Sequence, residues 1–209
     1  MIDDEDQVLL EAWRSGDKES GDRLVRRHVG LLYRFFRNRA AEHTADLVQR
    51  TFLAAVEARD RVPADVSFRP YLLGIARNTW LMFVRSSARR RRVLGTSDDS
   101  RGVEQGTTPS GAAAAREEQR LLLRGLRRLP LDMQLCIELF YWEGLSRAEI
   151  AAVLGCETNT IKSRLQRAKL RLREVLVELD PLTGTVTAAD LERWAASLRD
   201  HAHGDGGDS

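Results

Sequence analysis

The sequence predicts an all-α protein, with two small helical domains joined by a flexible linker. Apolar residues recur at helical spacing in both halves of the chain, and no stretch alternates with a period of two for long enough to predict a strand. Residues 95–115 contain Val103 as their only large apolar residue and are rich in Gly, Ser, Thr and Ala, a composition typical of linkers. We therefore expect helical domains at 1–94 and 116–178, a linker at 95–115, and a C-terminal tail at 179–209.

Three helices are predicted in the N-terminal domain, near residues 24–36, 46–56 and 72–83. Apolar residues recur every three or four positions in each of them. Pro63 and Pro70 interrupt the chain between the last two runs, because proline lacks the amide donor that a helix interior needs. The residues predicted to face inward are Leu24, His28, Leu31, Leu32, Phe35 and Phe36, then Leu47, Val48, Phe52, Ala55 and Val56, and then Leu72, Ala76, Thr79 and Phe83.

The C-terminal domain contains a predicted helix-turn-helix motif. Ser146, followed three residues later by Glu149, has the capping-box pattern of a short helix, and Gly155 ends that helix. The next stretch, Thr158 to Arg173, carries six basic residues and no acidic one. At about 100° per residue, one face of this second helix is apolar and the opposite face carries amide, hydroxyl and cationic groups. The apolar seam consists of Ile161, Leu165, Ala168 and Leu172.

The net charge of +2 hides a strong segregation of charge along the chain. Residues 77–92 and 158–173 each carry a net charge of +6, whereas residues 1–22 carry −6 and residues 176–209 carry −5. Two basic blocks between acidic ends indicate a polyanionic partner that is contacted at two places. Amide, hydroxyl and cationic groups on a helix surface suit the edges of DNA bases. These patterns predict a DNA-binding protein.

Two blocks of the sequence match motifs of a known family. The first block consists of ADLVQRTFLAAV (45–56) and FRPYLLGIARNTWLMFVRSSARRRR (68–92). The second consists of LP (129–130), EGLS (143–146), EIA (149–151), LG (154–155) and TIKSRLQRAKLRLRE (160–174). They resemble region 2 and region 4, respectively, of the extracytoplasmic-function (ECF, group IV) subfamily of bacterial RNA polymerase sigma factors. The two blocks occur in the order of the family, with the linker between them.

The resemblance implies that the chain binds core RNA polymerase and directs promoter recognition and transcription initiation. It implies minus-35 contacts from the second helix of the helix-turn-helix, at Asn159, Thr160, Lys162, Ser163, Arg164, Gln166 and Arg167. It implies minus-10 contacts from the loop around 61–69 and from Arg77, Asn78, Arg85, Arg89 and Arg90. Polymerase contact is expected at Asp46, Gln49, Arg50 and Leu53. The implied partners are core RNA polymerase and promoter DNA, and the sequence leaves open whether an anti-sigma factor is a third partner.

Four residues depart from the family pattern. An acid usually follows the DLVQ sequence, and Arg50 stands there. Glu157 and Asn159 occupy positions where Pro and Gly are frequent, which changes how the start of the second helix is capped. Trp80 is bulkier than usual for its position, and two interpretations stay open: a core aromatic, or a platform on which an unpaired base stacks.

Other function classes lack their signatures. The four histidines have no zinc-ligand spacing, and the sequence contains neither a GxSxG motif nor a glycine-rich phosphate loop, so we expect no enzyme, metal or cofactor. No apolar run approaches the roughly 18 residues of a membrane span. The acidic N-terminus differs from a secretory signal, so a cytoplasmic location is expected. Cys136 and Cys156 are predicted to be buried thiols.

The sequence alone leaves two questions open. The alternative function is a stand-alone helix-turn-helix regulator acting without polymerase, which would need an effector domain or a dimer face in place of the region 2 block. In the tail, Thr187 with Asp190 predicts a capped amphipathic helix that carries Leu191, Trp194, Ala195 and Leu198 on one side. That tail either docks on the two domains and regulates them, or is a fraying end.

Overall fold

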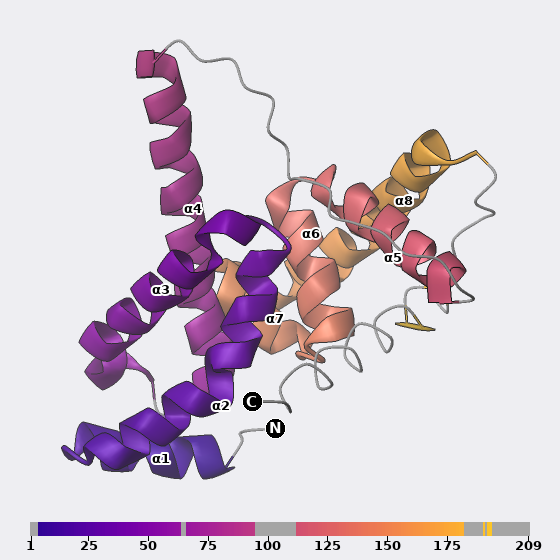
Figure 1. Ribbon diagram of the computed structural model, residues 1–209. Coiled ribbons are helices and arrows are strands. Elements are labelled where there is room, and N and C mark those ends of the chain that lie inside the picture. The colour runs from indigo at the N-terminus through magenta and orange to yellow at the C-terminus, as the bar shows by residue number, and fades with distance from the viewer. Residues whose placement is uncertain (1–3, 64–65, 95–111, 182–189, 191, 194–209) are drawn as a thin grey trace. The chain divides into compact units, whose positions relative to one another are not determined.

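Figure 1 shows the computed structural model of the chain, which describes residues 4–63, 66–94, 112–181, 190 and 192–193. The described residues form helices and contain no strand, which confirms the predicted all-α class. The chain divides into two compact units, Met1–Val103 and Glu104–Ser209. The finer division into two domains, a linker and a tail stays a prediction. Among the described helices, none combines the length and the apolar character that a membrane crossing needs.

The first unit contains four α-helices and two short 3₁₀ turns among its described residues. In chain order they are α1 (Asp4–Arg14), α2 (Lys18–Arg37), η1 (Ala41–His43), α3 (Thr44–Ala58), η2 (Arg59–Arg61) and α4 (Phe68–Leu94). α2 begins after Asp17, whose side chain accepts a hydrogen bond of 3.0 Å from the amide of Glu19. No helix is predicted before residue 24, so α1 is an addition to the expected fold.

The core of the first unit lies where α2, α3 and α4 pack together. All six residues predicted to face inward on α2 are buried, as are Leu47, Val48 and Ala55 on α3. Val56 is 38% exposed and Phe52 is half-buried, so the buried stripe of α3 is narrower than predicted. Thr51 completes this stripe, because its hydroxyl donates to the carbonyl oxygen of Leu47 at 2.8 Å and can therefore be buried.

The second unit is built around its longest helix. Its described elements are α5 (Ala112–Arg127), α6 (Leu131–Ile137), a π-helical turn η3 (Glu138–Trp142), α7 (Arg147–Leu154) and α8 (Thr158–Leu179). α8 packs against α5, α6 and α7. α5 begins at Ala112, inside the segment expected to be a linker, because the four alanines at 112–115 favour a helix. The tail helix expected from Thr187 lies outside the described residues, apart from Asp190, Glu192 and Arg193.

The core of the second unit joins α5, α6 and α8. Its buried cluster consists of Leu122, Leu126, Leu129, Ile137, Tyr141, Ala168, Leu172 and Leu176. Gly125 lets α5 approach α8 closely, since a β-carbon there would lie 2.7 Å from Leu176 Cδ2. Cys136 is buried, as predicted, whereas Cys156 is only partly buried. Burial raises the pKa of the Cys136 thiol to about 11, so this thiol stays neutral at ordinary pH.

Candidate nucleic-acid interface

The turn between α7 and α8 has the geometry of a helix-turn-helix motif. At the start of α7, the Glu149 amide donates to Ser146 Oγ at 3.2 Å and the Ser146 amide donates to Glu149 Oε2 at 2.8 Å, which completes the predicted capping box. Gly155 follows the last residue of α7 in the left-handed conformation, with φ of 65° and ψ of 45°. Glycine adopts this conformation at little cost because it has no β-carbon. Local sequence therefore determines where α7 ends.

α8 separates an apolar face from a polar one, as its periodicity predicts. The buried residues are Ile161, Leu165, Ala168, Leu172, Val175 and Leu176. On the other side of its N-terminal half, the exposed residues are Asn159, Lys162, Ser163, Gln166 and Arg167, and Thr160 is partly exposed. Their amide, hydroxyl and cationic groups are those that hydrogen-bond to base edges in the major groove. The structure thus brings six of the seven predicted minus-35 residues to one accessible surface.

Arg164, the seventh of these residues, lies differently. Its side chain is only 20% exposed, and its Nη1 lies 3.7 Å from Oδ2 of Asp132 on α6. The same nitrogen lies 3.8 Å from the sulfur of Cys156 in the turn. Arg164 therefore connects α8 to α6 and to the turn, at the packing contact between helices rather than on the exposed polar face.

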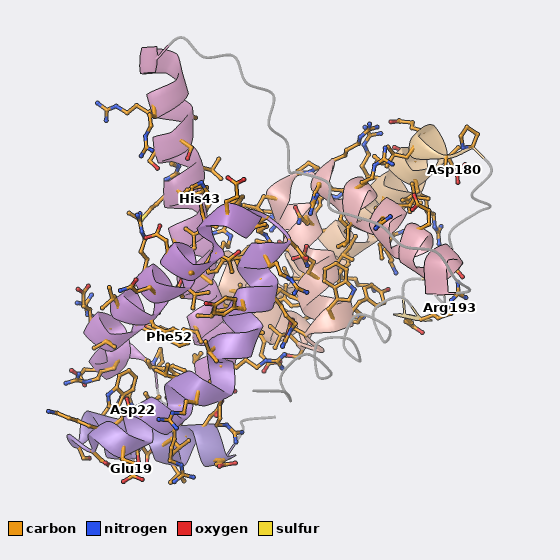
Figure 2. All side chains as sticks on the ribbon, in the orientation of Figure 1. Glu19, Asp22, His43, Phe52, Asp180 and Arg193 are labelled. Atoms are coloured by element: carbon orange, nitrogen blue, oxygen red, sulfur yellow. The ribbon has the colours of Figure 1, made fainter. Side chains whose placement is uncertain are left out.

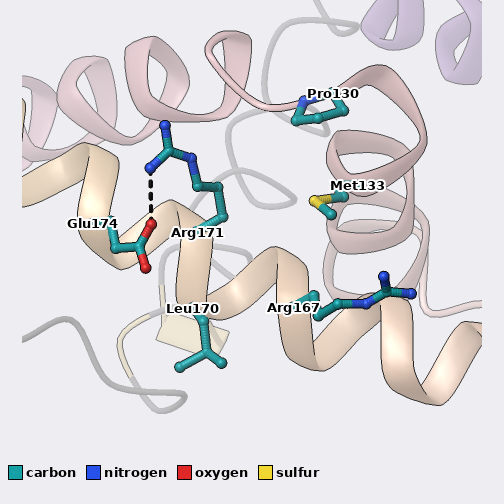
Figure 3. A pocket seen from close by; sticks show the side chains of 6 residues that line it. All are labelled: Pro130, Met133, Arg167, Leu170, Arg171 and Glu174. Atoms are coloured by element: carbon teal, nitrogen blue, oxygen red, sulfur yellow. Dashed lines mark hydrogen bonds and ion pairs between the residues drawn. The ribbon is translucent and has the colours of Figure 1, made fainter.

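A shallow, open hollow of about 440 Å³ lies beside the middle of α8. Figure 3 shows its lining side chains, Pro130, Met133, Arg167, Leu170, Arg171 and Glu174. Arg171 turns towards Glu174, with 2.8 Å between Nη1 and Oε2, and lies 3.8 Å from Glu178 Oε1. Arg167 instead donates to the carbonyl oxygen of Ser163 at 3.4 Å. Acidic neighbours therefore offset the positive charge of Arg171.

The second basic block lies along α4. Asn78, Arg85, Arg89 and Arg90 are exposed there, and Arg77 is partly exposed. The helix has 27 residues and no acidic residue in its sequence. At 1.5 Å per residue it extends for roughly 40 Å. A helix of this length and charge presents a long cationic surface to a nucleic-acid backbone.

Two aromatic residues of this basic helix contact each other, and one of them also contacts the ring of His43. Trp80 stacks on Phe83 with 5.6 Å between ring centroids and 28° between ring planes. Phe83 in turn lies 4.9 Å from the ring of His43, which Figure 2 labels in the 3₁₀ turn η1 before α3. Trp80 and Phe83 are both half-buried. The packing is thus compatible with both interpretations of Trp80.

The four predicted polymerase-contact residues share one exposed face of α3. Their spacing of i, i+3, i+4 and i+7 places Asp46, Gln49, Arg50 and Leu53 on the same side of the helix. Leu53 is 56% exposed. Arg50, which replaces the acid usual in the family, pairs with Asp46 at 2.9 Å between Nε and Oδ1. The face therefore combines an exposed apolar side chain at one end with an ion pair at the other, groups that a protein partner can contact.

The sequence predicts no role for Arg14. In the structure this residue contacts the segment between α3 and α4. Arg14 Nε donates to the carbonyl oxygen of Arg59 at 2.9 Å, and its Nη2 donates to that of Val62. A signal for α1 was present, since Leu9, Leu10 and Trp13 have helical spacing. No local pattern predicts the contact itself, because its partners lie more than 40 positions along the chain.

The chemistry that these surfaces support is binding. Among the described residues, no group of three or more His, Cys, Asp or Glu side chains is arranged to hold a metal ion. The surfaces consist of two cationic helix faces, on α8 and α4, and one mixed polar and apolar face on α3.

The family description "Sigma-70 region 2" matches residues 23–90, and "Sigma-70, region 4" matches residues 119–172. Among curated relatives, the ECF RNA polymerase sigma-E factor of Escherichia coli is 30% identical over 179 residues, which cover 78% of this chain and 90% of the relative. The ECF RNA polymerase sigma-E factor of Haemophilus influenzae is 29% identical over 177 residues, with 78% and 91% of the two chains covered.

Solved structures agree with these matches. CnrH, in complex with the cytosolic domain of CnrY, matches with a TM-score of 0.61 and 27% identity, covering 84% of this chain and 99% of that chain. The sigma factor RpoE of Bartonella quintana, in complex with the anti-sigma factor NepR, matches with a TM-score of 0.60 and 26% identity, covering 78% and 98%. The chain therefore belongs to the extracytoplasmic-function family of RNA polymerase sigma factors.

Proposed function

We propose that this chain binds core RNA polymerase and directs it to promoters, and that its three exposed helix faces divide this work. The observation that carries the proposal is the presence, in one chain, of a cationic helix face in each of two separate units. A polypeptide built in this way can contact two elements of one DNA molecule. In this role the protein is regulatory, and the chemistry of RNA synthesis belongs to the polymerase.

The second unit is assigned to the minus-35 element. Lys162, Gln166 and Arg167 on the exposed face of α8 are suited to base edges, since cationic side chains recognise guanine and glutamine recognises adenine. Asn159, Thr160 and Ser163 lie beside them near the start of the helix. The inward position of Arg164 supports a role for it in holding α8 in place.

The first unit is assigned to the minus-10 element and to the polymerase. The cationic surface of α4, with Arg77, Asn78, Arg85, Arg89 and Arg90, suits an unpaired strand whose phosphates it neutralises. The exposed face of α3 around Leu53 suits the polymerase. Both surfaces lie within residues 23–90, the part matched by the region 2 description.

We also propose an anti-sigma factor as a partner. The support is that RpoE, which is similar over 98% of its own length, was solved bound to the anti-sigma factor NepR. A partner of this kind would keep the chain from core polymerase until a signal releases it.

The test is run-off transcription with purified core polymerase, with and without this chain, over a panel of candidate promoters. The proposal predicts transcripts that depend on the chain and on both promoter elements. Binding of the free chain to promoter duplex should be weak by comparison. Tight, sequence-specific binding to duplex without polymerase, together with no chain-dependent transcript from any promoter, would favour the stand-alone regulator instead.

A further inference from the structure

Gly30 is exposed in the middle of α2, where no packing contact among the described residues requires a glycine. A β-carbon at Gly30 would meet only Arg34 Nη1, at 3.6 Å, which is ordinary van der Waals contact. At Gly21 and Gly125, in contrast, a β-carbon would lie 2.5 Å and 2.7 Å from neighbouring side-chain atoms. Glycine inside a helix is less favourable than alanine because it loses more conformational freedom on folding. Gly30 therefore lowers the stability of the first unit without a reason in its described packing.

Cationic side chains surround Gly30 on the surface of α2. In an α-helix, the residues three, four and seven positions away on either side lie on the same face. For Gly30 these six positions hold Arg23, Arg26, Arg27, Tyr33, Arg34 and Arg37. Residues 23–41 contain six arginines and no acidic residue, so their net charge of +6 equals that of each basic block on α4 and α8. A short length of bare helix backbone thus lies between five arginine residues.

Acidic residues offset this charge on one side. Arg27 Nη1 lies 2.6 Å from Glu5 Oε2, and Arg23 Nη2 lies 3.7 Å from Glu5 Oε1, so α1 neutralises part of one flank. Asp22, which Figure 2 labels, precedes the cationic stretch on α2. The positive charge that faces solvent is therefore strongest beyond Asp22 and away from Glu5.

Arg26, Gly30, Tyr33 and Arg37 are here called the α2 surface, and all four residues are exposed. Arg26 and Arg37 lie eleven positions apart, which is about 16 Å along the helix axis. The major groove of duplex DNA is about 12 Å wide, so the two side chains can reach phosphates on both sides of it. Guanidinium groups and tyrosine hydroxyls both donate hydrogen bonds to phosphate oxygens. Because Gly30 has no side chain, the DNA can approach the helix closely between them.

The charge and composition of the α2 surface favour duplex DNA over two other partners. A second copy of this chain, paired by two-fold symmetry about Gly30, would bring Arg26 of one copy near Arg34 of the other, where like charges repel. A single DNA strand is held by several aromatic rings on which its bases stack. Tyr33 is the one aromatic residue at the six positions around Gly30.

We propose that the α2 surface binds backbone phosphates of duplex promoter DNA, as a contact that is independent of base sequence and additional to those of α4 and α8. The inference rests on the proposed function, which supplies promoter DNA as the partner. Arg26 and Arg37 provide the charge, Tyr33 adds a hydroxyl donor, and Gly30 leaves room for the DNA. The contact adds affinity and does not alter promoter preference.

The first experiment measures the affinity of the holoenzyme, the complex of core polymerase with this chain, for a promoter duplex at several salt concentrations. The variants are Arg26→Ala, Arg37→Ala and the double variant. The matched control is Lys18→Ala, because Lys18 is an exposed cation of the same helix that lies about 120° around the axis from Gly30. We expect each single variant to reduce the slope of log affinity against log salt concentration by about 0.9, since each arginine neutralises one phosphate. The double variant should reduce the slope by about twice as much, and Lys18→Ala should leave it unchanged.

The affinity should fall about two- to fivefold for each arginine, the size of an exposed ion pair. The factor should be the same on every single-base variant of the minus-10 and minus-35 elements. An unchanged slope in the double variant would overturn the inference, and so would an equal change in Lys18→Ala or a loss that differs among the base variants. No promoter binding by the holoenzyme of the unmutated chain would refute the proposed function, and this inference with it.

The second experiment separates contact with DNA from a role in the fold. Glutamine is uncharged and is a better helix former than glycine, so Gly30→Gln should raise the thermal midpoint of the free protein. The same variant should lower the affinity of the holoenzyme for promoter duplex, because its side chain holds the DNA away from Arg26 and Arg37. Gly30→Ala should raise the midpoint with a smaller loss of affinity. A midpoint that falls, or an affinity that stays unchanged in Gly30→Gln, would overturn the inference. Weaker co-elution of these variants with core polymerase, at an unchanged salt slope, would assign the α2 surface to a protein contact and would overturn it as well.

Discussion

Arg164 Nη1 lies 3.7 Å from Asp132 Oδ2, so α8 is tied to α6 by a cation that the family resemblance assigns to the DNA contacts. Within this pair, the side chain of Arg164 is only 20% exposed. In the proposed function α8 reads DNA and must keep its orientation on the domain, and we expect the contact between Arg164 and Asp132 to contribute to that orientation. Arg164 and Arg167 are only three positions apart, yet they face the domain and the solvent respectively.

Arg164→Ala should lower stability and leave base preference intact. We expect the free energy of unfolding to fall by about 1 kcal/mol, the size of a partly exposed ion pair with some lost packing. Transcription should fall by a similar factor on every minus-35 variant. Thermal denaturation measures the loss of stability, and transcription from the set of minus-35 variants measures base preference. Asp132→Ala is the matched partner variant, and a flattened minus-35 preference in Arg164→Ala alone would place Arg164 at a base edge.

Arg167→Ala should act on base preference. Loss of a base contact costs about 1–3 kcal/mol and relaxes preference at one position. Arg171→Ala is the matched control, because Arg171 is paired with Glu174 and lies one turn further along. Arg171→Ala should lower transcription from all promoters by a similar factor. It should reduce the slope of log affinity against log salt concentration by about one at most. The measurement is transcription over single-base minus-35 variants at two salt concentrations. If both variants change transcription by the same factor on every promoter, α8 binds DNA by its charge and does not read the sequence.

The sequence predicts the recognition motif well because its signals are local. The capping box of Ser146 and Glu149 and the left-handed Gly155 lie within ten residues of one another, and each follows from short-range stereochemistry. The apolar seam of α8 is equally clear, since all four of its predicted residues are buried. Local rules are thus enough to place the exposed polar face.

The features that sequence reasoning missed depend on distant partners. Arg164 lies only about 60° from Ile161 around the helix, so periodicity alone cannot assign it to either face. Its position is decided by Asp132, on a different helix. The docking of α1 likewise depends on tertiary partners, because Gly21 lies against the Trp13 ring with no room for a β-carbon. The π-helical turn η3 has no local signature that we recognise.

Leu53→Asp should weaken assembly with core polymerase. Leu53 is 56% exposed on the α3 face, so an aspartate there leaves the fold intact and places a charge in the proposed contact. We expect about a tenfold loss of affinity or more, since charge in a desolvated contact costs over 1 kcal/mol. Val8→Asp, on α1 at 65% exposure, is the matched control. Equal co-elution of both variants with core polymerase would argue against this face.

Gly155→Ala should strain the helix-turn-helix. A β-carbon at Gly155 would meet no atom within 4 Å, so the cost is purely one of backbone conformation at φ of 65°. That cost is about 1–2 kcal/mol for alanine and smaller for asparagine, which visits the left-handed region more readily. Urea denaturation of Gly155→Ala and Gly155→Asn should therefore rank alanine as the less stable. Equal stability would mean that the turn relaxes to another conformation.

Asp6 should make the stability of the first unit sensitive to acid. Its side chain is 3% exposed and is paired with His28 and Arg27. Burial alone would raise the pKa of the Asp6 carboxyl, but the hydrogen bond and charge of His28, with the charge of Arg27, lower it below its ordinary value of 3.8. A lowered pKa in the folded state means that the unfolded chain takes up this proton first. The stabilisation is therefore complete above about pH 4 and is lost as pH falls through the folded-state value.

Asp6→Asn should remove this dependence at one position. Asparagine keeps the size of the side chain but does not titrate. It leaves His28 without the carboxylate of Asp6, whereas Arg27 keeps its ion pair with Glu5. We expect a loss of about 1–3 kcal/mol at neutral pH, the cost of a buried polar contact imperfectly satisfied. The gap to the unmutated protein should narrow as the pH falls below about 4, because the unfolded chain then takes up a proton at Asp6 and folded Asp6 follows at lower pH. Urea denaturation of both proteins, at pH values from neutral down into that acidic range, measures the loss of stability at neutral pH and the narrowing of the gap. A gap that stays constant across the range would show that Asp6 stabilises the unit by its shape and not by its charge.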